Sequence, residues 1–240
     1  DNLIIDGTYA GRTHPDRLKT EYALIEKVKE IVESGGRAIL PCFAVGRTQE
    51  VMLLLKDLKY NMWVDGMGKT ISRYYLDRPE YVRNEKALRA AKRRFREVRT
   101  PSDRRRARRE AQVIVTTGGM LDGGPVLTYI EDVKNDPKSA ILLTGFQVED
   151  SNGSRLLSEG VINVQNVKEE IPHPVKIKCQ VEMYSLSAHA DHNELMDFIN
   201  ACDPEKVVLM HSDDRQPLAQ DIEASGMEVI LPMADEEFTL

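Results

Sequence analysis

The chain has 240 residues, of which 41% are hydrophobic and 30% charged, and its formal net charge is −6. This composition indicates a globular protein of one large or two modest domains, and because no long apolar run is present we expect no membrane partner. The three cysteines are widely spaced and form no C-x-x-C pair, which argues against a thiolate zinc site and favours a reducing compartment, so we expect a cytoplasmic protein.

Apolar patterns along the chain alternate between strand and helix. The chain opens on a strand-like run at residues 3–5 with neither an initiator Met nor the features of a signal peptide, so we expect the beginning of the protein to be missing. Helical spacing covers residues 18–32, 48–58, 85–98, 126–133, 193–200 and 218–223, and short β-branched runs cover 38–40, 62–64, 113–116, 140–143, 175–183, 207–210 and 227–231. This alternation predicts an α/β fold with a largely parallel sheet.

Basic residues are concentrated between Arg83 and Arg109, in a chain that is otherwise acidic. Such a stripe could neutralise the phosphates of RNA, with Arg104, Arg105 and Arg106 as the candidate contacts. The alternative is a solvated, partly helical arm that is interrupted at residues 100–103. The sequence leaves both interpretations open.

Two glycine-rich segments resemble phosphate-binding loops. In the first, Gly68-Lys69-Thr70 is typical of NTPases, but Trp63 stands where that motif requires glycine, so we exclude an NTPase. In the second, Gly118 and Gly119 follow a predicted strand, and a backbone without side chains could approach a phosphodiester there. The alternative for this segment is a tight strand-to-helix turn.

Histidines gather near the end of the chain. The segment Leu186-Ser187-Ala188-His189-Ala190-Asp191-His192 holds two of the five histidines, and His211 closes the predicted strand at 207–210. Imidazole exchanges a proton near neutral pH, so these residues suggest an acid–base site beside a carboxylate. The alternative for His189 is a histidine of the core or of a helix N-cap. We expect His192 on a helix surface, and we expect His14 and His173 in loops.

Several motifs in colinear order resemble the β-CASP nucleases, and most closely the archaeal homologues of the pre-mRNA 3′-end cleavage endonuclease, with RNase J as the next relative. The motifs are LIIDGTY at 3–9, LPCFAVGRTQE at 40–50, VDGMG at 64–68, TGGM at 117–120, LTGFQVE at 143–149, SAHAD at 187–191 and MH at 210–211. The resemblance implies a Rossmann-like β-CASP cap domain with a parallel sheet at residues 12–185. It also implies that residues 1–11 and 186–240 belong to a metallo-β-lactamase αββα sandwich.

The resemblance also implies roles for individual residues. His189 would be the general acid that protonates the leaving oxygen, Asp6 would orient its ring, and His211 would bind zinc. Arg47, Gly118 and Gly119 would lie at the RNA-binding cleft. Two departures from the family pattern, Ser212 in place of a glycine and Gly118 in place of a serine, remove no functional side chain.

The H-x-H-x-D-H motif that holds two zinc ions in this family does not occur in the chain. We therefore expect the cap and C-terminal part of a zinc-dependent ribonuclease whose two ions are not retained by these residues alone. Its partners would be RNA and the missing N-terminal half, or a chain that supplies that half, and a homodimer is included among the expected assemblies. The alternative function is a non-catalytic RNA-binding or assembly subunit of an RNA-processing complex.

Overall fold

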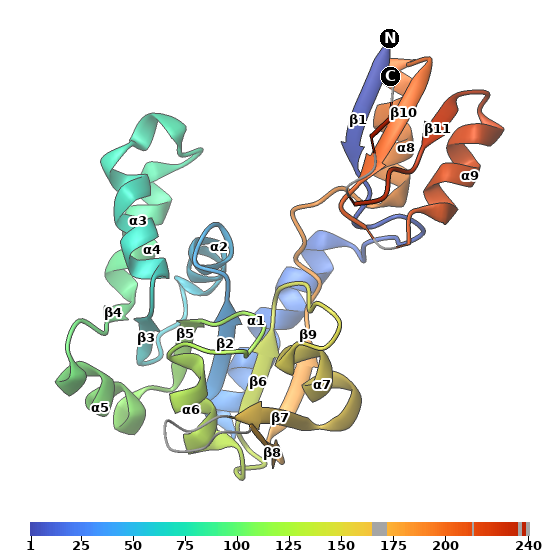
Figure 1. The fold of residues 1–240 in the computed structure, drawn as a ribbon. Coiled ribbons are helices and arrows are strands. Elements are labelled where there is room, and N and C mark those ends of the chain that lie inside the picture. Colours follow the sequence, from blue (N-terminus) through green and yellow to red (C-terminus); the bar gives the residue numbers. More distant parts are fainter. Residues whose placement is uncertain (165–171, 213, 235–236, 239–240) are drawn as a thin grey trace. The chain divides into compact units, whose positions relative to one another are not determined.

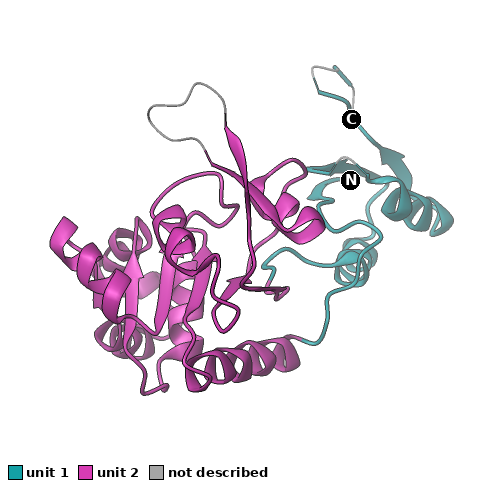
Figure 2. Ribbon diagram, turned by 90° about the horizontal axis from the view of Figure 1, so that it is seen from below, with its two compact units in different colours: residues 1–16, 187–240 teal, residues 17–186 magenta. Residues whose placement is uncertain are grey.

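The computed structural model describes residues 1–164, 172–212, 214–234 and 237–238, and the chain divides into two compact units (Figure 2). Unit 2 is the continuous segment 17–186, and unit 1 combines residues 1–16 with residues 187–240. The domain boundaries expected from the sequence, after residues 11 and 185, lie five residues and one residue from these divisions. The assignment of the outer segments to a metallo-β-lactamase-like domain stays a prediction.

Unit 2 is built on a six-stranded sheet in which all paired strands are parallel, in the order β4-β3-β5-β2-β6-β9 (Figure 1). The strands are β2 (Ala38–Cys42), β3 (Met62–Asp65), β4 (Arg96–Glu97), β5 (Val113–Thr117), β6 (Ala140–Leu143) and β9 (Gln180–Met183). The α/β prediction with a parallel sheet is confirmed. Parallel strands place their carboxyl ends at the same edge, so the loops after β2, β3, β5 and β6 meet there.

Helices connect these strands and cover both faces of the sheet. They are α1 (Arg17–Glu33), α2 (Arg47–Leu55), α3 (Gly68–Asp77), α4 (Glu85–Arg94), α5 (Pro101–Glu110), α6 (Val126–Val133) and α7 (Asn152–Glu159), with a short 3₁₀ turn at Pro79–Tyr81. An antiparallel pair, β7 (Val161–Val164) with β8 (His173–Lys176), completes unit 2.

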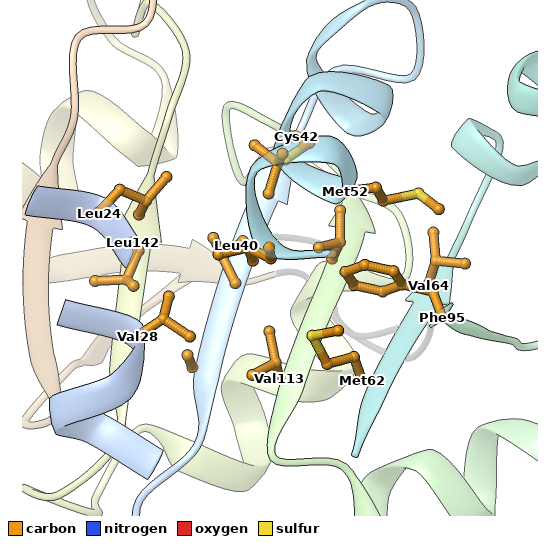
Figure 3. Close-up of a cluster of buried hydrophobic side chains, with 14 of the residues drawn as sticks. Leu24, Val28, Leu40, Cys42, Met52, Met62, Val64, Phe95, Val113 and Leu142 are labelled. Carbon is orange, nitrogen blue, oxygen red and sulfur yellow. The ribbon is translucent and has the colours of Figure 1, made fainter. Parts of the chain in front are cut away.

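The core of unit 2 lies on both faces of the sheet because successive strand residues point to opposite sides. Leu40 and Cys42 of β2 belong to one buried cluster, with α1, α2 and α4, whereas Ile39 belongs to the second, with α6. Figure 3 shows the first cluster, in which Leu24 and Val28 of α1 lie opposite residues of the central strands. Burial on both faces explains why these strands read as continuous apolar runs.

Unit 1 is a smaller parallel sheet, β1-β10-β11, packed on two helices. Its elements are β1 (Asn2–Asp6), α8 (His192–Cys202), β10 (Lys206–Met210), α9 (Gln216–Ala224) and β11 (Glu228–Ile230). The first strand of the chain therefore pairs with a strand about 200 residues later, in the register Asp6 to Met210.

Two predicted elements differ clearly from the structure, and the helices α3 and α7 and the strand β7 were not predicted. The helix predicted to reach residue 98 ends at Arg94, since Arg96 and Glu97 pair with β3 as β4. The strand predicted over 175–183 is two strands, β8 and β9, and His173 lies in β8, so placing it in a loop was wrong. The arm that the sequence left partly helical contains α5, which begins with Thr100 and Asp103 as a capping box.

A candidate acid–base site in unit 1

Asp6 and His211 are brought together by the pairing of β1 with β10. Asp6 is the last residue of β1, and His211 follows the last residue of β10, so both side chains stand at the carboxyl edge of the small sheet. The His211 Nδ1 lies 3.8 Å from the Asp6 Oδ1. His211 has a positive φ of 60°, an uncommon conformation for a residue with a side chain. Its side chain is 74% exposed and therefore accessible to a ligand.

His189 completes this group from the loop that precedes α8. Its Nδ1 lies 2.8 Å from the second carboxylate oxygen of Asp6, Oδ2. Asp6 is an acceptor when ionised, so the ring donates through Nδ1–H and its Nε2 is left for another group. The His189 side chain is 52% exposed, which excludes the alternative of a core histidine.

Thr8 fixes the Asp6 carboxylate. The Thr8 hydroxyl donates to Asp6 Oδ1 at 2.5 Å, and the Thr8 backbone N–H lies 3.2 Å from the same oxygen. Burial alone would raise the pKa of Asp6, but the hydrogen bonds from Thr8 and His189 outweigh it and lower the pKa below its ordinary value. Asp6 is therefore a carboxylate at neutral pH.

The loop that carries His189 is anchored on both sides. Asp191 is the N-cap of α8 in a capping box with Glu194, and its other oxygen accepts the backbone N–H of His14 at 2.8 Å. The His14 Nε2 donates in turn to the His189 carbonyl at 3.0 Å, and the His14 ring packs edge-on against Tyr9. His14 lies in a loop as predicted, but its hydrogen bond to the loop of His189 was not predicted.

His192 has both ring nitrogens engaged. Its Nδ1 accepts the backbone N–H of Gly11 at 2.9 Å, and its Nε2 lies 2.8 Å from a carboxylate oxygen of Asp221. The side chain is only 14% exposed, so it is less accessible than the surface position that we expected. These contacts tie the first residue of α8 to α9 and to the segment after β1.

The residues around His211 do not by themselves fit a zinc site. Zinc sites take three or four protein ligands, usually His, Cys, Asp or Glu. Within the described ranges no group of three such side chains has a suitable arrangement. His211 can therefore contribute one ligand, and a complete site would need ligands from outside these residues.

The predicted RNA-contacting glycines lie at the carboxyl edge of the large sheet in unit 2. Gly118 follows β5 with a φ of 115°, and a Cβ there would meet the carbonyl oxygen of Gly123 at 2.5 Å. A Cβ on Gly119 would lie 3.2 Å from the backbone nitrogen of Phe43, which follows β2. The turn thus needs glycine for its own backbone geometry, which supports the alternative of a tight strand-to-helix turn. An RNA contact by Gly118 and Gly119 stays a prediction.

Arg47 lies in unit 2 at the start of α2 and is buried. Its guanidinium forms an ion pair with Glu50 and donates to the carbonyl of Leu186. These contacts fix the first turn of α2 against the last residue of unit 2. A direct RNA contact by Arg47 stays a prediction.

The three arginines predicted to bind RNA have different surroundings on α5. Arg104 donates from Nε and Nη2 to the fully buried carboxylate of Asp65, at 2.7 and 3.0 Å, and the hydroxyl of Tyr129 donates to the same carboxylate. Arg106 pairs with Glu110 of its own helix. Arg105 is exposed and has no ion pair among the described residues. The geometry gives Arg104 a structural contact that the charge pattern did not indicate.

Two family models match the chain. The Beta-Casp domain matches residues 48–156, within unit 2, and the Zn-dependent metallo-hydrolase RNA specificity domain matches residues 174–232. Over the described residues, no helix is both long and apolar enough to cross a membrane.

Several curated relatives of the chain are archaeal proteins. The chain is 38% identical to the probable RNase MJ4 of Methanocaldococcus jannaschii over 90% of this chain and 50% of that protein. It is 33% identical to the RNase aCSPSF2 of Saccharolobus solfataricus over 99% of this chain and 48% of that protein. It is 29% identical to the transcription termination factor FttA of M. jannaschii over 91% of this chain and 38% of that protein. The chain thus spans about half the length of the first two.

A solved structure supports the fold alone. A crystal structure of a protein of unknown function from Enterococcus faecalis V583 matches all of this chain and 51% of its own, with a TM-score of 0.54 at 11% identity. The colinear motifs, the two matching domains and the archaeal relatives agree with one another. The chain therefore belongs to the β-CASP family of metallo-β-lactamase-fold proteins, among relatives that include archaeal ribonucleases.

Proposed function

We propose that this chain supplies the general acid and one metal ligand of a zinc-dependent ribonuclease that hydrolyses RNA phosphodiesters in RNA processing or decay. The observation that carries the proposal is the hydrogen bond between His189 Nδ1 and Asp6, beside the exposed imidazole of His211. The names of two relatives, the probable RNase MJ4 and the RNase aCSPSF2, support the same substrate class.

Hydrolysis of a phosphodiester needs a proton donor for the oxygen that leaves phosphorus. His189 suits this role because Asp6 holds its Nδ1–H, which orients the ring and leaves Nε2 for the leaving oxygen. Asp6 stays ionised and balances the charge of the imidazolium before the proton is transferred. Thr8 and His14 hold the carboxylate and the loop in place, so that the ring does not have to be ordered during the reaction.

His211 would hold zinc together with ligands from outside this chain. When bound, zinc lowers the pKa of water and so supplies the attacking hydroxide. The contribution of this chain is an accessible imidazole directly after a strand end, with its Nδ1 3.8 Å from the Asp6 carboxylate.

The proposal is tested on the full-length protein with single-stranded RNA. Wild type should cleave RNA with bound zinc, and His211→Ala should lose both zinc and cleavage because one ligand is removed. His173→Ala is the matched control, since His173 is an exposed histidine of unit 2, and it should keep both. Wild-type protein that binds RNA without cleaving it would contradict the proposal and favour a non-catalytic RNA-binding subunit.

A further inference from the structure

A basic groove lies in unit 2 where α3, α4 and β4 meet, away from the α5 arginines considered above. It is an open groove of about 680 Å³. Figure 1 shows α3 and α4 side by side next to β3 and β4. The groove is lined by six cations, Arg73, Arg89, Lys92, Arg93, Arg96 and Arg99, and by two carboxylates, Asp77 and Glu97.

The carboxylates do not balance the cations of this groove. Glu97 is shared between Lys92, at 2.5 Å, and Arg99, at 3.1 Å. Neither Arg73 nor Arg93 has an ion pair among the residues that the structure describes, and both side chains are exposed. The groove therefore holds a surplus of positive charge that nothing described in the chain neutralises.

The remaining arginines are held in place by neighbours outside the groove. Arg89 pairs with Glu85 at 2.5 Å. Arg96 lies 3.8 Å from Glu110, and its guanidinium lies over the ring of Trp63. Contacts of this kind keep planar guanidinium groups ordered, and an ordered guanidinium matches the geometry of a phosphate.

The surplus is local rather than a property of the whole chain. The segment 73–109 holds 15 of the 33 Lys and Arg residues but only 5 of the 39 Asp and Glu residues, so its net charge is +10 in a chain of net charge −6. A concave surface lined by one sign of charge concentrates its field and attracts a polyanion. Beside it, the 56% exposed ring of Tyr74 lies under the guanidinium of Arg73 and offers a face for base stacking.

The groove is connected to the carboxyl edge of the large sheet. The helix α3 begins at Gly68, directly after the loop that follows β3, and Arg73 comes five residues later, about 7.5 Å along the helix axis. A strand of nucleic acid lying at that edge could therefore continue over α3 into the groove.

We propose that this groove binds the phosphate backbone of single-stranded RNA, at residues separate from the hydrolytic group in unit 1. The identity of the polyanion as RNA rests on the proposed function. The role of the groove would be to hold a length of the substrate independently of its sequence, because phosphate contacts carry no base information.

The test is RNA binding across a salt series. The groove variant replaces Arg73, Arg93 and Arg99 with Gln, and the control variant replaces Lys59, Lys176 and Lys178 with Gln. All six side chains are exposed, so the two variants lose the same charge from different surfaces of unit 2. Affinity for an oligouridylate is measured with full-length protein in a His189→Ala background, so that the RNA stays intact.

Three lost phosphate contacts should reduce the slope of log affinity against log salt by about 2 for a single strand. Between about 50 and 200 mM salt, the groove variant should therefore lose about 20-fold less affinity than wild type, whereas the control should follow wild type. Equal slopes for all three proteins, or equal changes of slope in both variants, would overturn the proposal that the groove binds RNA. Because this assay measures binding, its failure would leave the cleavage test of the proposed function unaffected.

Discussion

Asp6 is the residue on which the candidate site depends, because Thr8, His189 and His211 all lie within 3.8 Å of its carboxylate. The sequence motifs predicted Asp6, His189 and His211, and the structure brings these three together. The residues that hold them, Thr8 and His14, were not predicted as part of the site. Thr8 is only two residues from Asp6, whereas His14 contacts a residue 175 positions later, which no local pattern can indicate.

Asp191 could have been placed from the sequence. An Asp followed three residues later by Glu before an apolar helix predicts a capping box, and Asp191 and Glu194 form one. By contrast, nothing local indicated that Arg104 pairs with Asp65, a residue 39 positions earlier in the chain. Charge patterns therefore located the basic segment but did not separate structural arginines from accessible ones.

At the scale of single residues, we predict the effect of Asp6→Asn in the full-length enzyme. An amide can no longer hold His189 in the Nδ1–H form, so the rate of RNA cleavage should fall by about 10²- to 10⁴-fold. Thr8→Val removes only a hydrogen bond to the carboxylate and should cost less than about tenfold. The measurement is the single-turnover rate. A wild-type rate for Asp6→Asn would show that the carboxylate does not orient the acid.

At the scale of elements, four strands of the large sheet were predictable, whereas the short strand β4 and the helices α3, α5 and α7 were not. Strands β2, β3, β5 and β6 are apolar on both faces, and each was placed within two residues. Helix α5 has the sequence PSDRRRARRE, in which Ala107 is the one buried residue, so an apolar period was absent. Helix α3 buries only Gly68 and Ser72, and it was missed for the same reason.

The pairing of α5 with β3 predicts a difference between neighbouring arginines. Arg104→Ala removes a guanidinium from the buried carboxylate of Asp65 and should lower the free energy of unfolding by about 1–3 kcal/mol, since Arg104 is itself partly exposed. Arg105→Ala, on the exposed side of α5, should change it by less than about 0.5 kcal/mol. Urea denaturation measures both.

The loss of stability in Arg104→Ala should depend on pH, because it depends on the charge of the Asp65 carboxylate. Burial alone would raise its pKa, but Arg104 and Tyr129 outweigh burial and hold the pKa below its ordinary value. A carboxylate with a depressed pKa stabilises the fold above its unfolded pKa, and this contribution is lost as pH falls through the folded pKa. The difference between wild type and Arg104→Ala should thus shrink as pH falls below about 4. A difference that grew in acid would contradict this assignment.

At the scale of the whole molecule, alternation of strands and helices predicted a parallel sheet but not its strand order. The order β4-β3-β5-β2-β6-β9 depends on which crossovers pack together, and the pairing of β1 with β10 spans nearly the entire chain. The sheet type follows from local patterns, because a strand that is buried on both faces has a continuous apolar run in its sequence. The strand order follows from tertiary packing, which the patterns do not specify.

The chain spans about half of its first two relatives, and this leads to a prediction about metal. Because His211 offers one ligand where a two-metal site needs several, the 240-residue polypeptide should hold no stoichiometric zinc pair after dialysis. Full-length protein should retain zinc under the same conditions. Elemental analysis of both preparations decides the point. Two tightly held ions in the short chain would show that ligands within it were overlooked.

The general-acid role of His189 is tested most directly with an RNA in which sulfur replaces the leaving oxygen of one phosphodiester. Sulfur leaves without protonation, so the loss of an acid should not slow this substrate. We predict that His189→Ala in the full-length enzyme cleaves ordinary RNA about 10²- to 10⁴-fold more slowly than wild type, with unchanged zinc content, and cleaves the sulfur substrate at nearly the wild-type rate. Equal slowing of both substrates, or a wild-type rate on ordinary RNA, would contradict the assignment of His189 as the acid.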